Sequence, residues 1–536
     1  MLKTLTLLTV AALSSKTALA QTPDTQKLDK SFTGQAALGE SGFVTISTDG
    51  EHVAFLSKAS DIVPAPVIGF FTNELYVRDV RTGSTSQVNL GSAGQSLTAY
   101  MFLNSSIHQR CSISADGRFV AFPSRVDDPG LGDTNGNVDI FLRDLQQGTT
   151  ELISTGPTGA TLFSRTTLSS LSDDARFVAF IGHGDEYVPG LPTPIAGDQV
   201  YLRDRQAGLT KIVSHPASDE VLNVVISADG STIAYVTGSL GTHNDELWIY
   251  DVATGTDVNL GSFKIDEGLS IDGTGSKVAF ATKLREVIPG DTNKKSDVFV
   301  IDVATGVISP VNVATDGHRG TGAAFNPSIS PDGRYVAFDA TGDGLAPVRL
   351  PTASATQLLH VYIHDLETGL TTLGSINDQG LAGVGSVNQA SARVGSTRAL
   401  SEHGSQLVFD SDYWNLAKPA TTNQGVFLRE LHTDGPALSM TGLVAGSSAT
   451  LHITGASPSG AVLVGVSLAG QGPLPSYWGL LDLSPPITTA YFTADASGTM
   501  AQALHVPASL VGTGVFVQGV DLIGYEATTT FFGVVQ

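Results

Sequence analysis

The sequence holds a single cysteine, Cys111, among 536 residues. One thiol cannot form an internal disulfide framework, and its isolation excludes a zinc or iron–sulfur site built from cysteines. Basic residues are also scarce, because 29 Lys and Arg stand against 51 Asp and Glu, a formal net charge of -22. A protein that binds nucleic acid by neutralising phosphates needs the opposite balance, so we expect no nucleic-acid partner.

The chain also lacks an apolar stretch long enough to span a bilayer. Its one pronounced apolar run, residues 5–13, follows Lys3 and precedes Ala18-Leu19-Ala20, which fits the small-x-small pattern of a signal-peptidase site. We therefore expect residues 1–20 to be a signal peptide and the mature protein to be exported, either to the periplasm or out of the cell.

Catalytic signatures are missing as well. The sequence has no His-Glu-x-x-His and no Gly-x-Ser-x-Gly pattern, which argues against zincin and α/β-hydrolase chemistry. Carboxylates are so plentiful that no catalytic pair can be chosen from the sequence. From these absences we predict a protein that is not an enzyme and has no cofactor, with calcium as the alternative considered below.

The dominant positive feature is an internal repeat with units about 59 residues apart. In each unit a turn, most often Asp-Gly, separates two apolar runs, which indicates a tight hairpin. A third run such as DIFLRD and a fourth, Thr-rich run follow. Four short strands repeated seven times predict an all-β fold, a seven-bladed β-propeller. The units begin at Thr45, Ser112, Ser170, Val225, Ser270, Ser328 and Ala399.

ISPDGRYVAF at residues 329–338 and DIFLRD at residues 139–144 carry a family resemblance. They resemble the PD40, or TolB-like, β-propeller repeat, a relative of the WD40-like repeats that here lacks the Trp-Asp dipeptide. The resemblance implies the fold. It leaves function open, because such repeats occur in binding proteins, in accessory domains of peptidases and in polysaccharide lyases. Units five and seven depart from the pattern, with Thr274 and His403 in place of the turn Asp.

The repeats and a change in composition divide the chain. We assign residues 21–433 to the propeller and expect residues 25–31 to supply the outer strand of the last blade, the alternative being a loose leader. No Lys or Arg follows Arg429. Strand-like runs separated by Gly, Ser and Pro make residues 434–536 a predicted small antiparallel β-sandwich, loosely similar to C-terminal modules of secreted bacterial proteins.

A residue type that most units share is expected to serve each blade. The Asp of the Asp-Gly turns and the Asp that ends each third strand are therefore interpreted as turn caps. Strand direction alternates within a blade, so these turns fall on one face of the disc. The long connections, such as residues 58–73, 125–138 and 341–359, fall on the other face. We predict that this long-loop face binds the ligand.

One loop pattern occurs twice, as GDTNGNVDIF and GDTNKKSDVF. Alternating oxygen side chains on a tight loop can wrap a hard cation such as calcium, although the EF-hand glycine is missing and lysines stand in the second copy. Side-chain-capped turns are the alternative. The candidate metal ligands are Asp133, Asn135, Asp139, Asp291, Asn293 and Asp297.

Four further residues are candidates for binding. Tyr413 and Trp414 are neighbouring aromatics in a late long loop and could stack on a sugar, or could instead fill a groove between blades. His183 and His243 fall in or beside long loops, where a solvated or turn-bonded imidazole is the alternative.

Together these observations predict an exported, non-enzymatic scaffold that binds an envelope or extracellular protein or glycan through its long-loop face. One alternative is a polysaccharide-degrading, lyase-like enzyme, which is disfavoured because an acidic loop face would repel uronates. The other is a purely structural cell-surface protein.

Overall fold

The computed structural model describes two compact units, one of which spans Pro23–Leu431 and the other of which contains His432–Gln536. Beyond residue 431 it describes the strands alone. Up to that point it describes residues 25–431 except 65, 67–72, 98–110, 156–165, 184–196, 215–219, 239–244, 285–286, 288–293, 315–316, 343, 347–357, 378–381, 385–391, 395–397, 414 and 417–423.

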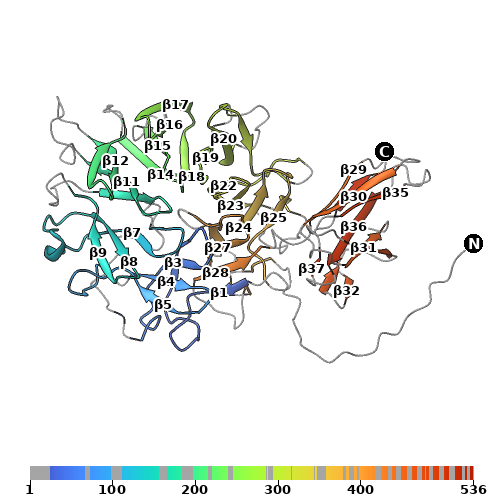
Figure 1. Cartoon of the computed structure of the whole chain (residues 1–536), viewed down its shortest axis with the longest axis horizontal. Helices are drawn as coiled ribbons and strands as arrows, with labels where there is room; N and C mark the ends of the chain where they lie inside the picture. Colours follow the sequence, from blue (N-terminus) through green and yellow to red (C-terminus); the bar gives the residue numbers. More distant parts are fainter. Residues whose placement is uncertain are drawn as a thin grey trace, which may run out of the picture. The chain divides into compact units, whose positions relative to one another are not determined.

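Seven four-stranded antiparallel sheets form the blades of a propeller, arranged as a ring in Figure 1. Blade 1 is β2 (Ser41–Ile46), β3 (His52–Ser57), β4 (Glu74–Asp79) and β5 (Thr85–Gln87). Blade 2 is β6 (Ser112–Ile113), β7 (Phe119–Ser124), β8 (Asp139–Asp144) and β9 (Thr149–Leu152). Blade 3 is β10 (Thr166–Leu171), β11 (Phe177–His183), β12 (Asp198–Asp204) and β13 (Leu209–Ile212). Blade 4 is β14 (Glu220–Ile226), β15 (Thr232–Gly238), β16 (Glu246–Asp251) and β17 (Thr256–Ser262).

Blade 5 is β18 (Ile265–Ile271), β19 (Lys277–Thr282), β20 (Asp297–Asp302) and β21 (Ile308–Pro310). Blade 6 is β22 (Ala324–Ile329), β23 (Tyr335–Thr341), β24 (Leu359–Asp365) and β25 (Thr371–Leu373). Blade 7 is β26 (Ala392–Val394), β27 (Gln406–Ser411), β28 (Gly425–Glu430) and, from the other end of the sequence, β1 (Thr25–Lys27). The predicted all-β, seven-bladed, TolB-like propeller is confirmed.

The ring closes where β1 pairs antiparallel with β28, which lie side by side in Figure 1. Lys27 Nζ and Asp29 Oδ2 form an ion pair of 3.0 Å, and both residues are buried. Asp29 Oδ1 also accepts the amide of Val426 at 3.0 Å. Residues 25–29 are therefore fixed to the last blade by backbone pairing and by a buried charge pair.

Each blade contains the same aromatic pair. The aromatic residue of the repeated V-A-F segment on the second strand faces an aromatic residue on the third strand, with ring centroids 5.6–6.2 Å apart in all seven blades. Such tilted or offset rings bury a large apolar area at the centre of a blade. This pair explains why one aromatic position recurs in every unit.

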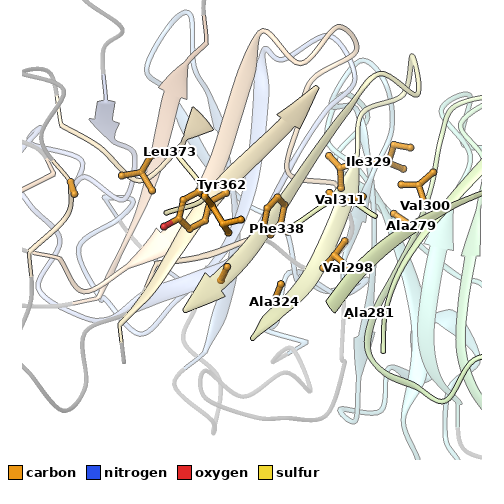
Figure 2. Packing of buried hydrophobic residues seen from close by; sticks show 14 residues of the cluster. Ala279, Ala281, Val298, Val300, Val311, Ala324, Ile329, Phe338, Tyr362 and Leu373 are labelled. Carbon is orange, nitrogen blue, oxygen red and sulfur yellow. The ribbon is translucent and has the colours of Figure 1, made fainter. Parts of the chain in front are cut away.

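The hydrophobic core is divided into seven clusters, one at each junction between neighbouring blades. Figure 2 shows the junction between blades 5 and 6, where Val298 and Val311 of one blade face Phe338 and Tyr362 of the next. Strand residues alternate between the two neighbouring clusters because successive side chains point to opposite faces of a sheet. Both faces of every blade are therefore covered, as the near-continuous apolar runs predict.

The Asp-Gly turns are capped and joined to one another. In five blades a Ser Oγ donates to the turn Asp at 2.5–2.7 Å, and that carboxylate accepts the amide two residues later. In blade 5, Asp272 substitutes for the missing cap and accepts Ser276 Oγ at 2.6 Å. The third-strand Asp residues likewise accept turn amides. The structural interpretation of these acids is confirmed.

A closed ring of backbone hydrogen bonds links the seven turns. At every junction an amide of one turn donates to a carbonyl of the neighbouring turn at 2.7–3.2 Å. The donors are Asp49, Ala115, Asp173, Asp229, Gly273, Asp332 and Glu402. We call this side of the propeller the Asp-Gly end.

The C-terminal unit is also built from strands. One sheet has the order β29 (Ala437–Thr441), β30 (Ser448–Thr454), β35 (Met500–His505). A second has the order β34 (Ile487–Thr493), β31 (Ala461–Ser467), β36 (Gly514–Asp521), β37 (Glu526–Ala527), with β38 (Phe531–Val534) also paired to β36. β32 (Leu474–Ser476) and β33 (Gly479–Leu481) form a hairpin. The β-sandwich stays a prediction. Among the described residues no helix is long and apolar enough to cross a membrane.

Candidate functional site at the long-loop end of the channel

The first strands of the seven blades surround a central pocket close to the Asp-Gly end. Arg398 reaches across it from blade 7, donating to Asp173 Oδ1 of blade 3 at 2.7 Å and to the Thr48 hydroxyl of blade 1. Thr48 in turn donates to Asp173 Oδ2 at 2.6 Å. This bridge and the backbone ring tie the blades together at the Asp-Gly end, which leaves the long-loop end as the natural approach for a ligand.

Two acids, Asp339 fully buried and Asp410 half-buried, break the repeat toward the long-loop end. Asp339 of β23 and Asp410 of β27 occupy the position after the second-strand aromatic, near the end of a strand that runs away from the Asp-Gly turn. The other five blades carry apolar residues there. Those residues are Leu56, Pro123, Ile181, Val236 and Ala281.

First strands are irregular in five blades, and two of these irregularities lie beside the acids. In blades 1 and 6 the pairing of the first two strands shifts register, and Phe43 and Asn326 adopt left-handed backbone conformations with φ of 51° and 48°. A bulge leaves amides without a ladder partner, and a carboxylate can accept them. Asp410 Oδ2 accepts the amide of Phe43 at 3.3 Å across the junction between blades 7 and 1.

Asp339 makes the corresponding contacts one blade earlier. Its Oδ1 accepts the amide of Val394 in blade 7 at 2.6 Å, and its Oδ2 accepts Asn326 Nδ2 at 2.8 Å. Asp339 is fully buried, whereas Asp410 is only half-buried and also accepts Gln424 Nε2 at 3.4 Å. Exposed Arg393 lies opposite Asp410 on the neighbouring strand.

The electrostatics of this group follow from burial. Desolvation raises the pKa of Asp339 well above its usual range, although the bonds from Asn326 and Val394 and the charge of Arg393 oppose the shift. Desolvation also raises the pKa of Asp410 to about 6, against the opposing effect of Arg393. The charge of Asp410 adds to the rise in the pKa of Asp339, because a nearby negative charge disfavours ionisation of a second carboxyl. We call Asp339, Asp410, Arg393, Asn326 and Gln424 the blade 6–7 cluster.

The predicted stacking surface is corrected by the structure. Tyr413 is 1% exposed, its hydroxyl donates to the carbonyl of Leu359 at 2.7 Å, and its ring stacks on buried His360 with centroids 5.2 Å apart. Burial lowers the pKa of His360 to about 4, so this imidazole is neutral at neutral pH. Tyr413 fills space between blades, the alternative weighed for it. Trp414 lies outside the described residues.

Of the two predicted histidines, the structure describes only His183, which lies in blade 3 and not in this cluster. His183 ends β11 in blade 3, with its side chain 53% exposed and its Nδ1 2.9 Å from Asp198 Oδ1. His243 lies outside the described residues. A binding role for these histidines stays a prediction.

Only part of the predicted metal set is described. Asp133, Asn135 and Asp139 lie in and after the loop that enters β8, where Asn135 Nδ2 donates to Asp139 Oδ2 at 2.7 Å. Desolvation raises the pKa of Asp133 to about 6 and that of Asp139 to about 7. Asp297 is buried and accepts Asn312 Nδ2 at 2.5 Å, whereas Asp291 and Asn293 lie outside the described residues. Within the described part of the chain, no three or more His, Cys, Asp or Glu side chains are grouped to hold a metal ion.

Sequence reasoning missed the blade 6–7 cluster, although a signal was present. Aligning the seven units against one another exposes Asp339 and Asp410 as the two polar residues at an otherwise apolar position. Acids that most units share were interpreted as structural. Single units were not compared with the repeat pattern, and that comparison is what singles out Asp339 and Asp410.

No family model matches the sequence, and no curated protein matches it. Solved structures resemble the chain. An oligogalacturonate lyase in complex with manganese has 12% identity and a TM-score of 0.46, covering 76% of this chain and 93% of its own. The β-propeller domain of the Trilobed protease from Pyrococcus furiosus has 12% identity and a TM-score of 0.43, with coverages of 73% and 94%. TolB from Acinetobacter baumannii has 13% identity and a TM-score of 0.32, with coverages of 74% and 81%.

These comparisons contradict one prediction. The absence of a catalytic motif led us to expect a protein that is not an enzyme, yet the similar structures include oligogalacturonate lyases and peptidases. We withdraw the prediction that this protein is not an enzyme.

Proposed function

We propose that this protein is an exported binding protein whose ligand is a neutral oligosaccharide, held at the long-loop end of the channel by the blade 6–7 cluster. The observation that carries the proposal is the departure from the repeat at Asp339 and Asp410, on the side of the propeller that the backbone ring does not occupy. Residues that every blade needs are shared, whereas residues that serve one ligand are expected in particular blades.

The chemistry of the cluster favours a sugar. Asp410 and Arg393 offer an acceptor and donors that are not fully buried, Asn326 and Gln424 add amides, and half-buried Phe43 supplies an apolar edge. Hydroxyl groups of a sugar both donate and accept hydrogen bonds, so they suit such a mixed set. A polyanion is disfavoured by the formal net charge of -22.

The test uses the mature chain and a defined panel of neutral, cationic and uronate oligosaccharides, with calorimetry as the readout. Arg393→Ala should weaken binding of a neutral member by about tenfold, as expected when an anchor residue is removed. Arg81→Ala is the matched control, since Arg81 is exposed in a turn between third and fourth strands at the opposite end. Binding that is equal in both variants, or restricted to uronates, would refute the proposal, and a protein ligand would then be sought.

A second candidate is cleavage of a polysaccharide, favoured by one observation. A carboxyl group with a pKa of about 6, such as Asp410, is suited to proton transfer near neutral pH. If the cluster is catalytic, incubation with neutral polysaccharides will release new reducing ends, and Asp410→Asn will abolish the release while leaving binding measurable. Binding without any release of ends would favour the first proposal.

A further inference from the structure

The connection between β7 and β8 in blade 2 is a folded loop. It contains the 3-10 helix η1 (Pro129–Leu131), which Asp128 caps by accepting the amide of Gly130 at 3.1 Å. Gly132 ends the helix in a left-handed conformation. The amide of Gly136 then donates to Asp127 Oδ1 at 2.9 Å, which folds the second half of the loop back onto the first.

Asp133 is the anomalous residue of this loop. Its side chain is fully buried, and among the described residues its Oδ2 has no hydrogen-bond partner. Its Oδ1 accepts the amide of Asn135 at a long 3.5 Å, and the backbone of Asp128 also favours the ionised carboxylate. A buried carboxylate with one unpartnered oxygen and no ion pair is costly, by several kcal/mol on the order-of-magnitude scale for desolvated charges. A cation bound beside this carboxylate would offset the cost of its burial.

Asp139 is fully buried nearby and accepts Ser154 Oγ at 2.5 Å. The charges of Asp133 and Asp127 both raise its pKa, which places the three acids within electrostatic range of one another. In the part of the chain that the structure describes, neither Asp133 nor Asp139 forms an ion pair with Lys or Arg. The negative charge of the loop is therefore left without a protein counter-charge.

The repeat separates the roles of the two acids. The position of Asp139 is polar in other blades too, where Glu74, Gln199 and His360 bond to a polar residue after the fourth strand just as Asp139 bonds to Ser154. Asp139 therefore has a structural role, because its hydrogen bond is repeated in other blades. Asp133 has no equivalent in those blades, and its one sequence counterpart is Asp291 in the second copy of the motif.

We infer that the loop from Asp127 to Asp139 in blade 2 is a calcium site in which Asp133 and Asp139 supply the carboxylate oxygens. Calcium prefers oxygen ligands and accepts irregular geometry, so neutral oxygens, including the amide of Asn135, can complete a set that starts from two carboxylates. A site with so few charges belongs with the weak sites of extracellular modules, which bind at about 0.1–1 mM.

The experiment measures thermal unfolding and calorimetric binding of the mature chain, with calcium, with magnesium and with chelator. In wild type, calcium at about 10 mM should raise the Tm by about 1.5–3 °C, and magnesium should not. Asp133→Asn should reduce the number of calcium ions bound by one per chain. It should also raise the Tm in chelator, because it removes an uncompensated buried charge.

Matched variants make the result specific. Asp116→Asn, a turn cap of the same blade outside this loop, should retain every calcium ion, and Asp291→Asn tests the second copy of the motif separately. The inference fails if wild type binds no calcium, if magnesium stabilises equally, or if Asp133→Asn retains the full number of ions. A lower Tm for Asp133→Asn in chelator would also overturn it, since that result would give Asp133 a structural role.

Discussion

The two ends of the propeller follow different rules. At the Asp-Gly end all seven blades are joined to their neighbours by a backbone hydrogen bond between turns, and in six of them an Asp caps the turn. Toward the long-loop end the blades differ, and Asp339 and Asp410 replace the apolar residues of the other five. The contrast indicates that one end maintains the ring while the other is free to acquire individual chemistry, as expected for loops on a rigid scaffold.

The largest expected effect comes from breaking the ring itself. Deleting residues 21–31 from the mature chain removes β1 and both members of the Lys27–Asp29 pair. We expect a loss of at least about 3 kcal/mol, from the β1 hydrogen bonds at about 1 kcal/mol each and from buried Leu28 at about 2–3 kcal/mol, and a lower Tm in a thermal melt. Deleting residues 21–24 alone is the control and should have no effect. An unchanged Tm after the longer deletion would mean that β1 does not hold the ring together.

Much of this ring could be predicted from the sequence, because it rests on local and repeated chemistry. The Asp-Gly turn, the V-A-F strand and the cap recur in most of the seven units, so the copies reinforce one interpretation. Even the irregular unit with Thr274 forms a regular blade, since Asp272 caps its turn instead.

The long-loop end could not be predicted in the same way. Whether Tyr413 is exposed depends on His360 and Leu359 of the neighbouring blade, a contact over more than fifty residues that no local pattern encodes. The placement of Asp410 depends on a bulge in a strand of blade 1, at Phe43. Contacts between residues of different units depend on how the blades pack, so the sequence of a single unit does not predict them.

A smaller effect is expected from a single cap at the Asp-Gly end. Asp116→Ala removes the acceptor of Ser114 Oγ and of the Arg118 amide. Two hydrogen bonds of about 1 kcal/mol each predict a loss of about 1–2 kcal/mol in the free energy of unfolding, measured by urea denaturation. Asp116→Asn keeps an acceptor and should lose less. Equal losses in both variants would show that the charge, rather than the cap, matters at this turn.

The smallest expected effect is the pH dependence of stability that Asp410 causes at the long-loop end. Burial raises the pKa of Asp410 from 3.8 to about 6, so the folded protein retains a proton that the unfolded chain releases. The stability that this group contributes is present below about pH 4 and is lost as pH rises toward its folded pKa. Asp410→Asn has no such loss, so its Tm relative to wild type should increase between pH 4 and pH 6. A Tm difference that is constant with pH would contradict the raised pKa.

The closing strand has a consequence for the order of folding. Thr25 and Arg429, which meet in the finished protein, are 404 residues apart in the chain. Contacts of such long sequence separation form late, because the entropy of closing the loop must be overcome first. Until then β28 has an unpaired edge that is open to pairing with another molecule. Ring closure is therefore expected to be a late step of folding. A chain that ends before residue 425 would lack β28, so β1 would have no strand to pair with.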